Sequence, residues 1–371
     1  MSAKTILVAP DSYKGCLSSE DVGKAMERGI KRACKDTDVI RFSASDGGEG
    51  FCECMRGIFG GRMISREVTF PDSSRGTASY LYCAETRSAY VELAAASGLT
   101  LTDPRKRDVL TATTLGTGEL IKDAVLRGAE HVTVGLGGSA TNDCGMGILH
   151  ALGCRFYDVN GLELFPCGAS LIKTKSADLV ALKEYKNIRF TAACDVVNPL
   201  CGKNGAAYVF APQKGADEAA VISLDKGMLN FAELTGIEIA SSGAGAAGGC
   251  GGALISLLGA EYVGGAKLLT GSHAFSLALE RCSAVFTGEG KTDSQTACGK
   301  LVAVIAEIAA ARGKPVYVIS GAVEDGVNLR DKGVSGCFPV TPRDMDIEEA
   351  YRRAEELVAD TAENVMRILS F

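Results

Sequence analysis

At both ends of the chain, short apolar runs alternate with longer segments whose apolar residues recur every three or four positions. Residues 5–9 and 39–44 are apolar runs that predict strands, and residues 18–32 predict a helix that begins with a Ser-Ser-Glu-Asp cap. Residues 284–287 and 316–320 repeat the strand pattern near the C-terminus. This alternation is typical of a Rossmann-like α/β domain, in which helices cover a parallel sheet.

The middle of the chain follows another pattern. Residues 63–70, 77–83 and 88–93 are strand candidates separated by polar turns, with no helix between them. They predict an antiparallel meander. Further along, residues 154–164 predict a hairpin around an Asn-Gly turn, and residues 206–210 predict another strand.

These patterns predict two domains, one inserted into the other. Residues 1–61 and 280–371 form the Rossmann-like parallel-sheet domain, and residues 62–279 form an inserted mixed-sheet α/β domain. A chain of 371 residues is longer than one ordinary domain core, which agrees with this division. We expect the functional site in the cleft between the two domains.

Composition and local sequence argue against nucleic-acid-binding, secreted, membrane-spanning and zinc-binding proteins. A net charge of −6 with scattered Lys and Arg offers no basic surface for a nucleic acid. The first residues lack the pattern of a signal peptide, and the longest apolar run, at 301–311, is too short to span a bilayer. The fourteen cysteines show no zinc-binding spacing. We therefore expect reduced, mostly buried thiols in a cytoplasmic protein without a membrane partner.

Five polar clusters follow predicted strands. Because ligands of open α/β sheets bind beyond the carboxyl ends of the strands, we expect these clusters to meet at one edge. Carboxylates, lysines and glycine-lined N–H groups at such an edge suit phosphoryl transfer. The clusters are residues 10–15, 45–50, 135–143, 194–202 and 287–295.

Residues 135–143, which we call the glycine loop, connect a predicted strand to a predicted helix. Backbone N–H groups in such a loop bind phosphates. We predict that Gly137 and Gly138 approach the phosphates of a nucleotide, with help from the side chains of Ser139 and Asn142. The alternative is a tight turn that only packs the protein.

Two carboxylates are candidates for the chemistry. Asp195 follows a buried strand and is our candidate general base, and Asp293 is our candidate ligand of Mg²⁺. The two assignments can be exchanged on this reasoning. Asp46 and Glu49 are reserve metal ligands, because they form a glycine-flanked acid pair at a strand end. Lys14, just past the first strand, is a catalytic and substrate-binding candidate because its positive charge suits an anion at the strand ends.

Ser12 and Asn198 complete the candidate substrate contacts, since each lies in a polar cluster after a strand. Residues 243–248 spell G-x-G-x-x-G, but the following glycines weaken the helix that a dinucleotide site needs. A dinucleotide-dependent oxidoreductase is therefore a weak alternative.

Taken together, these motifs resemble the type I family of bacterial glycerate kinases. The resemblance implies ATP-dependent phosphorylation of D-glycerate, usually to 2-phosphoglycerate, by a Rossmann-like domain and a second α/β domain. It leaves open the 3-position, a homodimer, and the role of residues 296–298, where many relatives carry a different run. The alternative to an enzyme is a sugar-acid-binding regulator that keeps the same fold without turnover. The matching pieces are APDSYKG (9–15), SDGGEGF (45–51), VELAAASGL (91–99), TTLGTGELI (113–121), GLGGSATNDCGMG (135–147), ACDVVNPLCGKNGAAYVFAPQKGA (193–216), GAGAAGGCGGAL (243–254) and FTGEGKTDSQTACGK (286–300).

Overall fold

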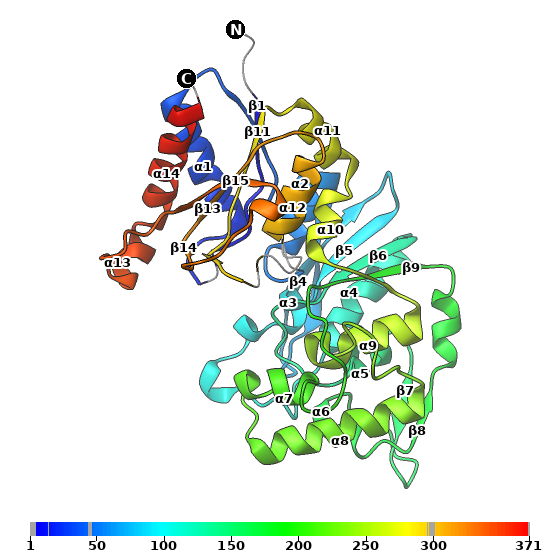
Figure 1. Cartoon of the computed structure of the whole chain (residues 1–371). Helices are drawn as coiled ribbons and strands as arrows, with labels where there is room; N and C mark the ends of the chain where they lie inside the picture. The colour runs from blue at the N-terminus through cyan, green and yellow to red at the C-terminus, as the bar shows by residue number, and fades with distance from the viewer. Residues whose placement is uncertain (1–4, 14, 44–46, 295, 297–300, 370–371) are drawn as a thin grey trace. The chain divides into compact units, whose positions relative to one another are not determined.

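The computed structural model covers the whole chain and forms two compact units (Figure 1). Unit 1 combines residues 1–45 with residues 265–371, and unit 2 contains residues 46–264. The structure describes every residue except 1–4, 14, 44–46, 295, 297–300 and 370–371.

Unit 1 is built on a parallel sheet. Among its described residues, five strands pair in the order β15-β13-β11-β1-β2, and every pairing is parallel. The central strands are short and almost fully buried, as expected where helices cover both faces of a sheet. The predicted Rossmann-like fold is confirmed. The strands are β1 (Thr5–Val8), β2 (Asp38–Arg41), β11 (Ala284–Thr287), β13 (Val316–Ser320) and β15 (Val334–Pro339).

Helices flank this sheet in unit 1 (Figure 1). The Ser18 side chain accepts a hydrogen bond from the Asp21 N–H and begins α1, as the sequence predicts. The C-terminal segment forms two helices in succession, because Arg353 leaves the helical conformation between them. The helices and remaining strands are α1 (Ser19–Ala33), α10 (Gly265–Thr270), α11 (His273–Arg281), α12 (Leu301–Ala310), α13 (Ile347–Arg352), α14 (Ala354–Leu369), η5 (Arg330–Lys332), β12 (Lys291–Thr292) and β14 (Ala322–Val323).

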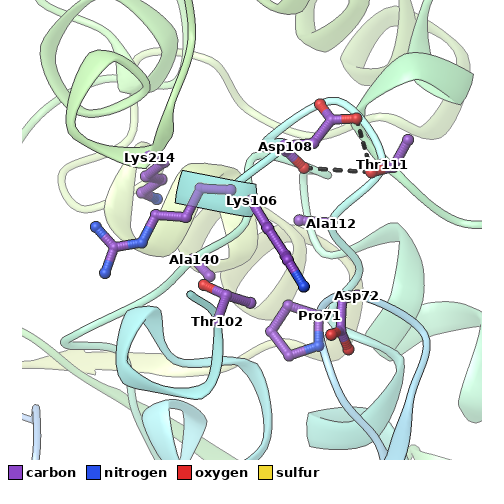
Figure 2. A pocket seen from close by; sticks show the side chains of 10 residues that line it. Pro71, Asp72, Thr102, Lys106, Asp108, Thr111, Ala112, Ala140 and Lys214 are labelled. Atoms are coloured by element: carbon purple, nitrogen blue, oxygen red, sulfur yellow. Dashed lines mark hydrogen bonds between the residues drawn. The ribbon is translucent and has the colours of Figure 1, made fainter. Parts of the chain in front are cut away.

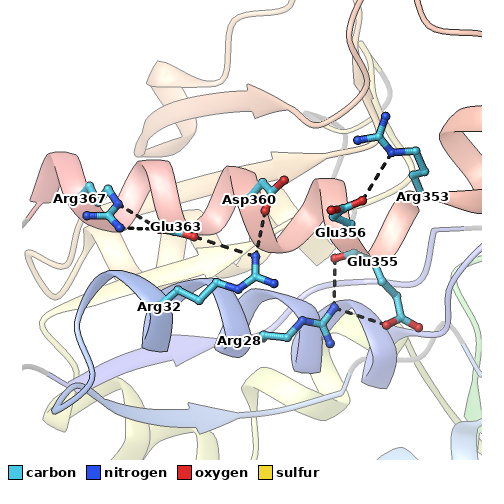
Figure 3. Close-up of polar contacts among 8 residues, drawn as sticks. All are labelled: Arg28, Arg32, Arg353, Glu355, Glu356, Asp360, Glu363 and Arg367. Carbon is cyan, nitrogen blue, oxygen red and sulfur yellow. Dashed lines mark hydrogen bonds and ion pairs between the residues drawn. The ribbon is translucent and has the colours of Figure 1, made fainter.

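Helices α1 and α14 pack closely. A Cβ atom at Gly29 of α1 would lie 2.0 Å from the carbonyl oxygen of Ala359, so only glycine fits at this crossing. A ladder of ion pairs follows the exposed rim of the two helices (Figure 3). Arg32 lies 2.9 Å from Asp360 and Arg28 lies 3.4 Å from Glu355. Because these side chains are about half exposed, the close packing contributes more to stability than the ion pairs.

Unit 2 is built on a mixed sheet. Among its described residues, six strands pair in the order β10-β9-β6-β5-β4-β3. The pairs β3–β4 and β4–β5 are antiparallel, which confirms the predicted meander, and the others are parallel. The strands are β3 (Arg62–Thr69), β4 (Arg75–Cys83), β5 (Ser88–Glu92), β6 (His131–Gly135), β9 (Arg189–Ala193) and β10 (Glu261–Val263).

The helices of unit 2 enclose a core between the sheet and α4, α5 and α9. A second core lies around α8, where Phe156 and Phe231 contact each other. The helices and remaining strands are α2 (Phe51–Phe59), α3 (Leu93–Ser97), α4 (Leu115–Leu126), α5 (Met146–Ala151), α6 (Gly168–Leu171), α7 (Ala206–Phe210), α8 (Glu218–Thr235), α9 (Ala246–Leu258), β7 (Arg155–Tyr157), β8 (Ser176–Asp178), η1 (Leu99–Leu101), η2 (Pro104–Lys106), η3 (Val180–Tyr185) and η4 (Pro212–Lys214).

The division of the structure differs from the expected boundaries at residues 62 and 279. Helix α2 groups with unit 2 because Phe51 and Phe59 pack against Tyr90 of β5. Helices α10 and α11 group with unit 1, where they contact α12 and β1.

One local prediction in unit 2 is wrong and another is confirmed. Residues 206–210 form α7 rather than a strand, because a five-residue apolar run suits either conformation. The predicted hairpin at 154–164 forms around the Asn-Gly turn. Tyr157 and Glu163 make an antiparallel bridge, and the N–H groups of Asp158 and Leu164 donate to the carbonyls of Leu162 and Phe156 at 2.9 and 2.8 Å. The Asp158 side chain closes the turn by accepting hydrogen bonds from two N–H groups within it, and β7 also pairs with β8.

Two further expectations concern thiols and membranes. The cysteines that the structure describes are free, and most are buried. Over the described ranges, no helix combines the length and the apolar character that crossing a membrane requires.

Candidate functional site

The glycine loop leaves the end of β6 and is held by backbone hydrogen bonds to three other segments of unit 2. The N–H of Leu136 donates to Ala193 at 3.0 Å, and the N–H of Gly137 donates to Gly47 at 2.9 Å. The N–H of Ala140 donates to Ser97 at 2.9 Å. The loop is therefore fixed at the carboxyl ends of β5, β6 and β9, where the sequence predicted a site.

Glycine is required at the outer part of this loop. A Cβ atom at Gly137 would lie 2.4 Å from the Cα of Gly48, and Gly138 has φ +70°. Gly138 is exposed. In the described part of the chain, the N–H groups of Gly138 and Ser139 donate to no acceptor. The loop thus presents backbone donors, as a phosphate-binding loop must.

The inner part of the loop surrounds a buried lysine that the sequence analysis missed. Lys214, at the end of η4, is 2% exposed. Its Nζ donates to Ser139 Oγ and to the Thr141 carbonyl, both at 2.7 Å, and to Asn142 Oδ1 at 3.3 Å. Burial lowers the pKa of Lys214 from 10.5 to about 8. A positive charge therefore lies directly beneath the predicted phosphate-binding loop.

Asp143 ends the loop and is also fully buried. Its Oδ2 accepts from the Thr114 N–H at 2.8 Å, the Thr114 hydroxyl at 2.7 Å and the Gly147 N–H at 3.2 Å, and its Oδ1 accepts from the Gly145 N–H at 3.1 Å. Burial raises the pKa of Asp143, and these hydrogen bonds oppose that rise. Its carboxylate is enclosed by donors, so we assign it to holding the loop rather than to contacting substrate.

The G-x-G-x-x-G run at 243–248 supports the same loop. No strand precedes it, and a Cβ atom at Gly248 would lie 2.0 Å from the Thr141 carbonyl oxygen. These glycines allow close packing beneath the glycine loop. Asn142 is fully buried in this packing, and its Nδ2 has no partner among the described residues.

A small pocket opens beside Lys214 and Ala140 (Figure 2). Its cavity volume is about 40 Å³. Lys106 and Arg107, which follow one another at the end of η2, also line it. We call this cavity the basic pocket.

The remaining candidates of unit 2 lie near the same strand ends. Asp195 is exposed and follows β9, and Asn198, which is half-buried, donates from Nδ2 to the Asn204 carbonyl at 2.9 Å. Glu49 is exposed just before α2. Glu92, which the sequence analysis passed over, accepts from the Cys52 N–H at the start of α2, and burial raises its pKa.

Unit 1 carries a separate group of polar residues at the carboxyl ends of β11 and β13. Glu289 is 8% exposed, and its carboxylate accepts from the hydroxyls of Thr296 at 2.6 Å and Thr292 at 3.2 Å. The Thr296 Oγ in turn accepts from the Asp293 N–H at 3.0 Å. Glu289 therefore positions Asp293, a role that its place in a Thr-Gly-Glu-Gly run after a strand could have suggested.

Ser12 lies in the same unit, and its N–H donates to Asp11 Oδ1 at 2.7 Å. Lys14 and Asp46 lie outside the described residues. Over the ranges that the structure describes, no three His, Cys, Asp or Glu side chains form a metal-binding group. Half-buried Asp293 and exposed Glu49 are single carboxylates, and Mg²⁺ is held by one or two carboxylates together with phosphates and water. Either residue therefore fits such a site.

Comparisons with known proteins agree with this architecture. The model of the glycerate kinase family matches residues 6–370. A glycerate 2-kinase of Escherichia coli is 38% identical over 98% of both chains, and a glycerate kinase of Bacillus cereus is 38% identical over 98% of this chain and 97% of its own. A crystal structure titled putative glycerate kinase 2, from Salmonella typhimurium, covers 100% of this chain and 99% of its own with a TM-score of 0.84 and 40% identity. These matches show that the chain belongs to the glycerate kinase family and that the protein is a kinase.

Proposed function

We propose that the protein transfers the terminal phosphoryl group of ATP to a hydroxyl of D-glycerate with the help of Mg²⁺. The observation that carries this proposal is the family match, which extends over residues 6–370. We favour 2-phosphoglycerate as the product, because the Escherichia coli relative is named a glycerate 2-kinase. The 3-position is the competing outcome.

The glycine loop is our proposed phosphate-binding element. The unengaged N–H groups of Gly138 and Ser139 and the buried charge of Lys214 support this role. Backbone donors and a fixed positive charge stabilise phosphate oxygens without reorganising during the reaction. Gly137 supports the loop by allowing its close contact with Gly48.

We assign proton transfer to one carboxylate and metal binding to another. Exposed Asp195 takes the proton of the attacking hydroxyl, and its exposure at the end of β9 makes it accessible to a substrate. Asp293, positioned by Thr296, holds Mg²⁺, with Glu49 and Asp46 as alternatives. When bound, the metal ion neutralises charge on the phosphate oxygens. Lys14, Ser12 and Asn198 are proposed contacts of the acid.

A direct assay tests the reaction. Purified protein with Mg²⁺, ATP and D-glycerate is expected to release ADP in a coupled assay, and phosphorus NMR of the product identifies the phosphorylated hydroxyl. If no phosphoglycerate forms above the control without protein, the proposal is wrong. D-glycerate binding without turnover would instead favour the sugar-acid-binding regulator.

We also propose a cytoplasmic protein whose substrates are small molecules. A homodimer is a further proposal, and light scattering on purified protein measures the mass that decides it. A mass near 38.6 kDa would exclude the dimer.

A further inference from the structure

The basic pocket is lined by three cations and by two carboxylates, Asp72 and Asp108. In the part of the chain that the structure describes, neither Lys106, Arg107 nor Lys214 lies within 4.0 Å of an Asp or Glu oxygen. Neighbouring Arg105, by contrast, pairs with Asp103 at 3.1 Å. Unpaired cations around one cavity of an otherwise acidic protein favour an anionic ligand.

The acidic residues at the pocket form no ion pair with these cations, although hydrogen bonds from Ser74 and, to a smaller extent, the charge of Lys106 lower the pKa of Asp72. Asp72 accepts from the N–H and hydroxyl of Ser74, and Asp108 accepts from the Leu110 N–H and the Thr111 hydroxyl. Figure 2 shows the Asp108–Thr111 contact at the edge of the pocket. Asp108 is therefore satisfied within its own turn, whereas Asp72 also has the charge of Lys106 nearby.

Arg107 supplies donors that the protein itself leaves unused. One of its terminal nitrogens donates to the Leu99 carbonyl at 3.1 Å, which fixes the guanidinium group. Its Nε is buried and has no hydrogen-bond partner among the described residues. A buried donor without a partner is costly, so a ligand oxygen gains binding energy when the Arg107 side chain shifts and brings this N–H to the cavity.

Lys214 contributes differently. Its three N–H bonds are directed at the glycine loop, so it acts on a ligand through its charge. Because it is fully buried, this charge is poorly screened by water. Lys106 is exposed and can turn toward a ligand at the mouth of the pocket.

The size of the cavity limits the ligand. About 40 Å³ accommodates a few water molecules or one small charged group, whereas pockets for whole drug-sized molecules measure roughly 300 to 1,000 Å³. A purine base is therefore too large. A carboxylate or a single phosphoryl group has the right size and the charge that the three cations need.

We propose that the basic pocket is an oxyanion subsite in which Arg107 and Lys106 bind one carboxylate or phosphoryl group above the charge of Lys214. The two candidate sources, the carboxylate of the acceptor acid and a phosphate of the nucleotide, rest on the proposed function. The subsite itself rests on the geometry of unit 2.

The test compares Arg107→Gln with Arg105→Gln, which removes the same charge two positions earlier in the chain, at a residue that does not line the pocket. Calorimetry measures binding of D-glycerate, ADP and inorganic phosphate to each folded variant, with glycerol and adenosine as uncharged probes. We expect Arg107→Gln to weaken binding of at least one of the three anions tenfold or more, and Arg105→Gln to leave all three within twofold. A tenfold rise in KM for D-glycerate alone identifies the carboxylate, and a rise for ATP alone identifies the phosphate.

Unchanged binding of all three anions by Arg107→Gln would overturn the subsite. If Arg107→Gln does not fold, Lys106→Gln replaces it, because the exposed Lys106 side chain makes no ion pair among the described residues. We then expect Lys106→Gln to weaken binding of at least one of the three anions threefold or more, and unchanged binding of all three would overturn the subsite. Failure of the proposed function has a different signature. Wild-type protein would then make no phosphoglycerate, while its binding of inorganic phosphate would still depend on Arg107.

Discussion

Replacing Asp143 by Asn tests whether a buried carboxylate holds the glycine loop in place. The change keeps the size of the side chain but turns one oxygen into an NH₂ group. Because both oxygens accept hydrogen bonds, the new NH₂ group must face a donor in either orientation. The less costly orientation sacrifices the bond from Gly145 and keeps the three bonds from Thr114 and Gly147.

The expected loss of stability follows from these bonds. A buried donor left without a partner costs about 1–3 kcal/mol. The remaining bonds also weaken, because bonds to a charged acceptor are roughly twice as strong as neutral ones. Relief of the buried negative charge of Asp143 offsets part of this loss. We therefore expect the free energy of unfolding to fall by about 3 kcal/mol, which is roughly a hundredfold in the unfolding equilibrium.

Urea unfolding followed by circular dichroism measures this difference. Asp158→Asn is the matched control, because Asp158 also accepts two backbone N–H bonds but lies in an exposed turn. We expect the control to lose less than about 1 kcal/mol. If Asp143→Asn stays within about 0.5 kcal/mol of wild type, or if the control loses as much, the carboxylate does not hold the loop.

Three further predictions concern the site. Gly138→Val should raise the KM for ATP at least tenfold, whereas Gly161→Val, at a similar positive φ in an open turn, should leave it unchanged. Equal effects of the two variants on this KM would show that the glycine loop does not bind ATP. Asp293→Asn should raise the Mg²⁺ concentration needed for half-activity. Asp195→Asn should lower kcat by roughly 10²- to 10⁴-fold without changing that Mg²⁺ concentration. Retention of more than about a tenth of kcat by both variants would contradict these roles. Because burial lowers the pKa of Lys214 to about 8 in the folded state, the unfolded state holds the proton more tightly between pH 8 and 10.5. The free energy of unfolding of wild type relative to Lys214→Met should therefore rise by about 3 kcal/mol over this range in urea titrations, and a constant difference would refute the low pKa.

Much of the fold could be predicted from the sequence because local patterns determine it. Short apolar runs such as residues 284–287 form strands that are buried on both faces. Such a run predicts a strand without any knowledge of which residues pack against it. The meander of β3, β4 and β5 could be predicted because only short polar turns separate its strands. The glycine loop also could be located, since glycines between a strand and a helix mark a close backbone approach.

Local patterns failed where two conformations suit the same residues. The apolar run at 206–210 forms a helix because Ala206 and Ala207 pack into the core around α8, and that core is assembled from distant segments. In the same way, α2 groups with unit 2 through the contacts of Phe51 and Phe59 with Tyr90. Sequence order places α2 beside the first strands, and only packing assigns it elsewhere.

Only the tertiary structure could find the centre of the candidate site. Lys214 is separated from Ser139 by 75 positions, and no spacing rule connects a lysine after a short helix with a glycine loop. In the sequence, Lys106 and Arg107 resemble any charged surface segment. The structure shows that both residues line one cavity and that the Nε of Arg107 is buried without a partner among the described residues, and these are properties of the folded chain. The sequence determined which segments form strands, helices and loops, whereas packing over long distances determined which charges are desolvated and directed at one place.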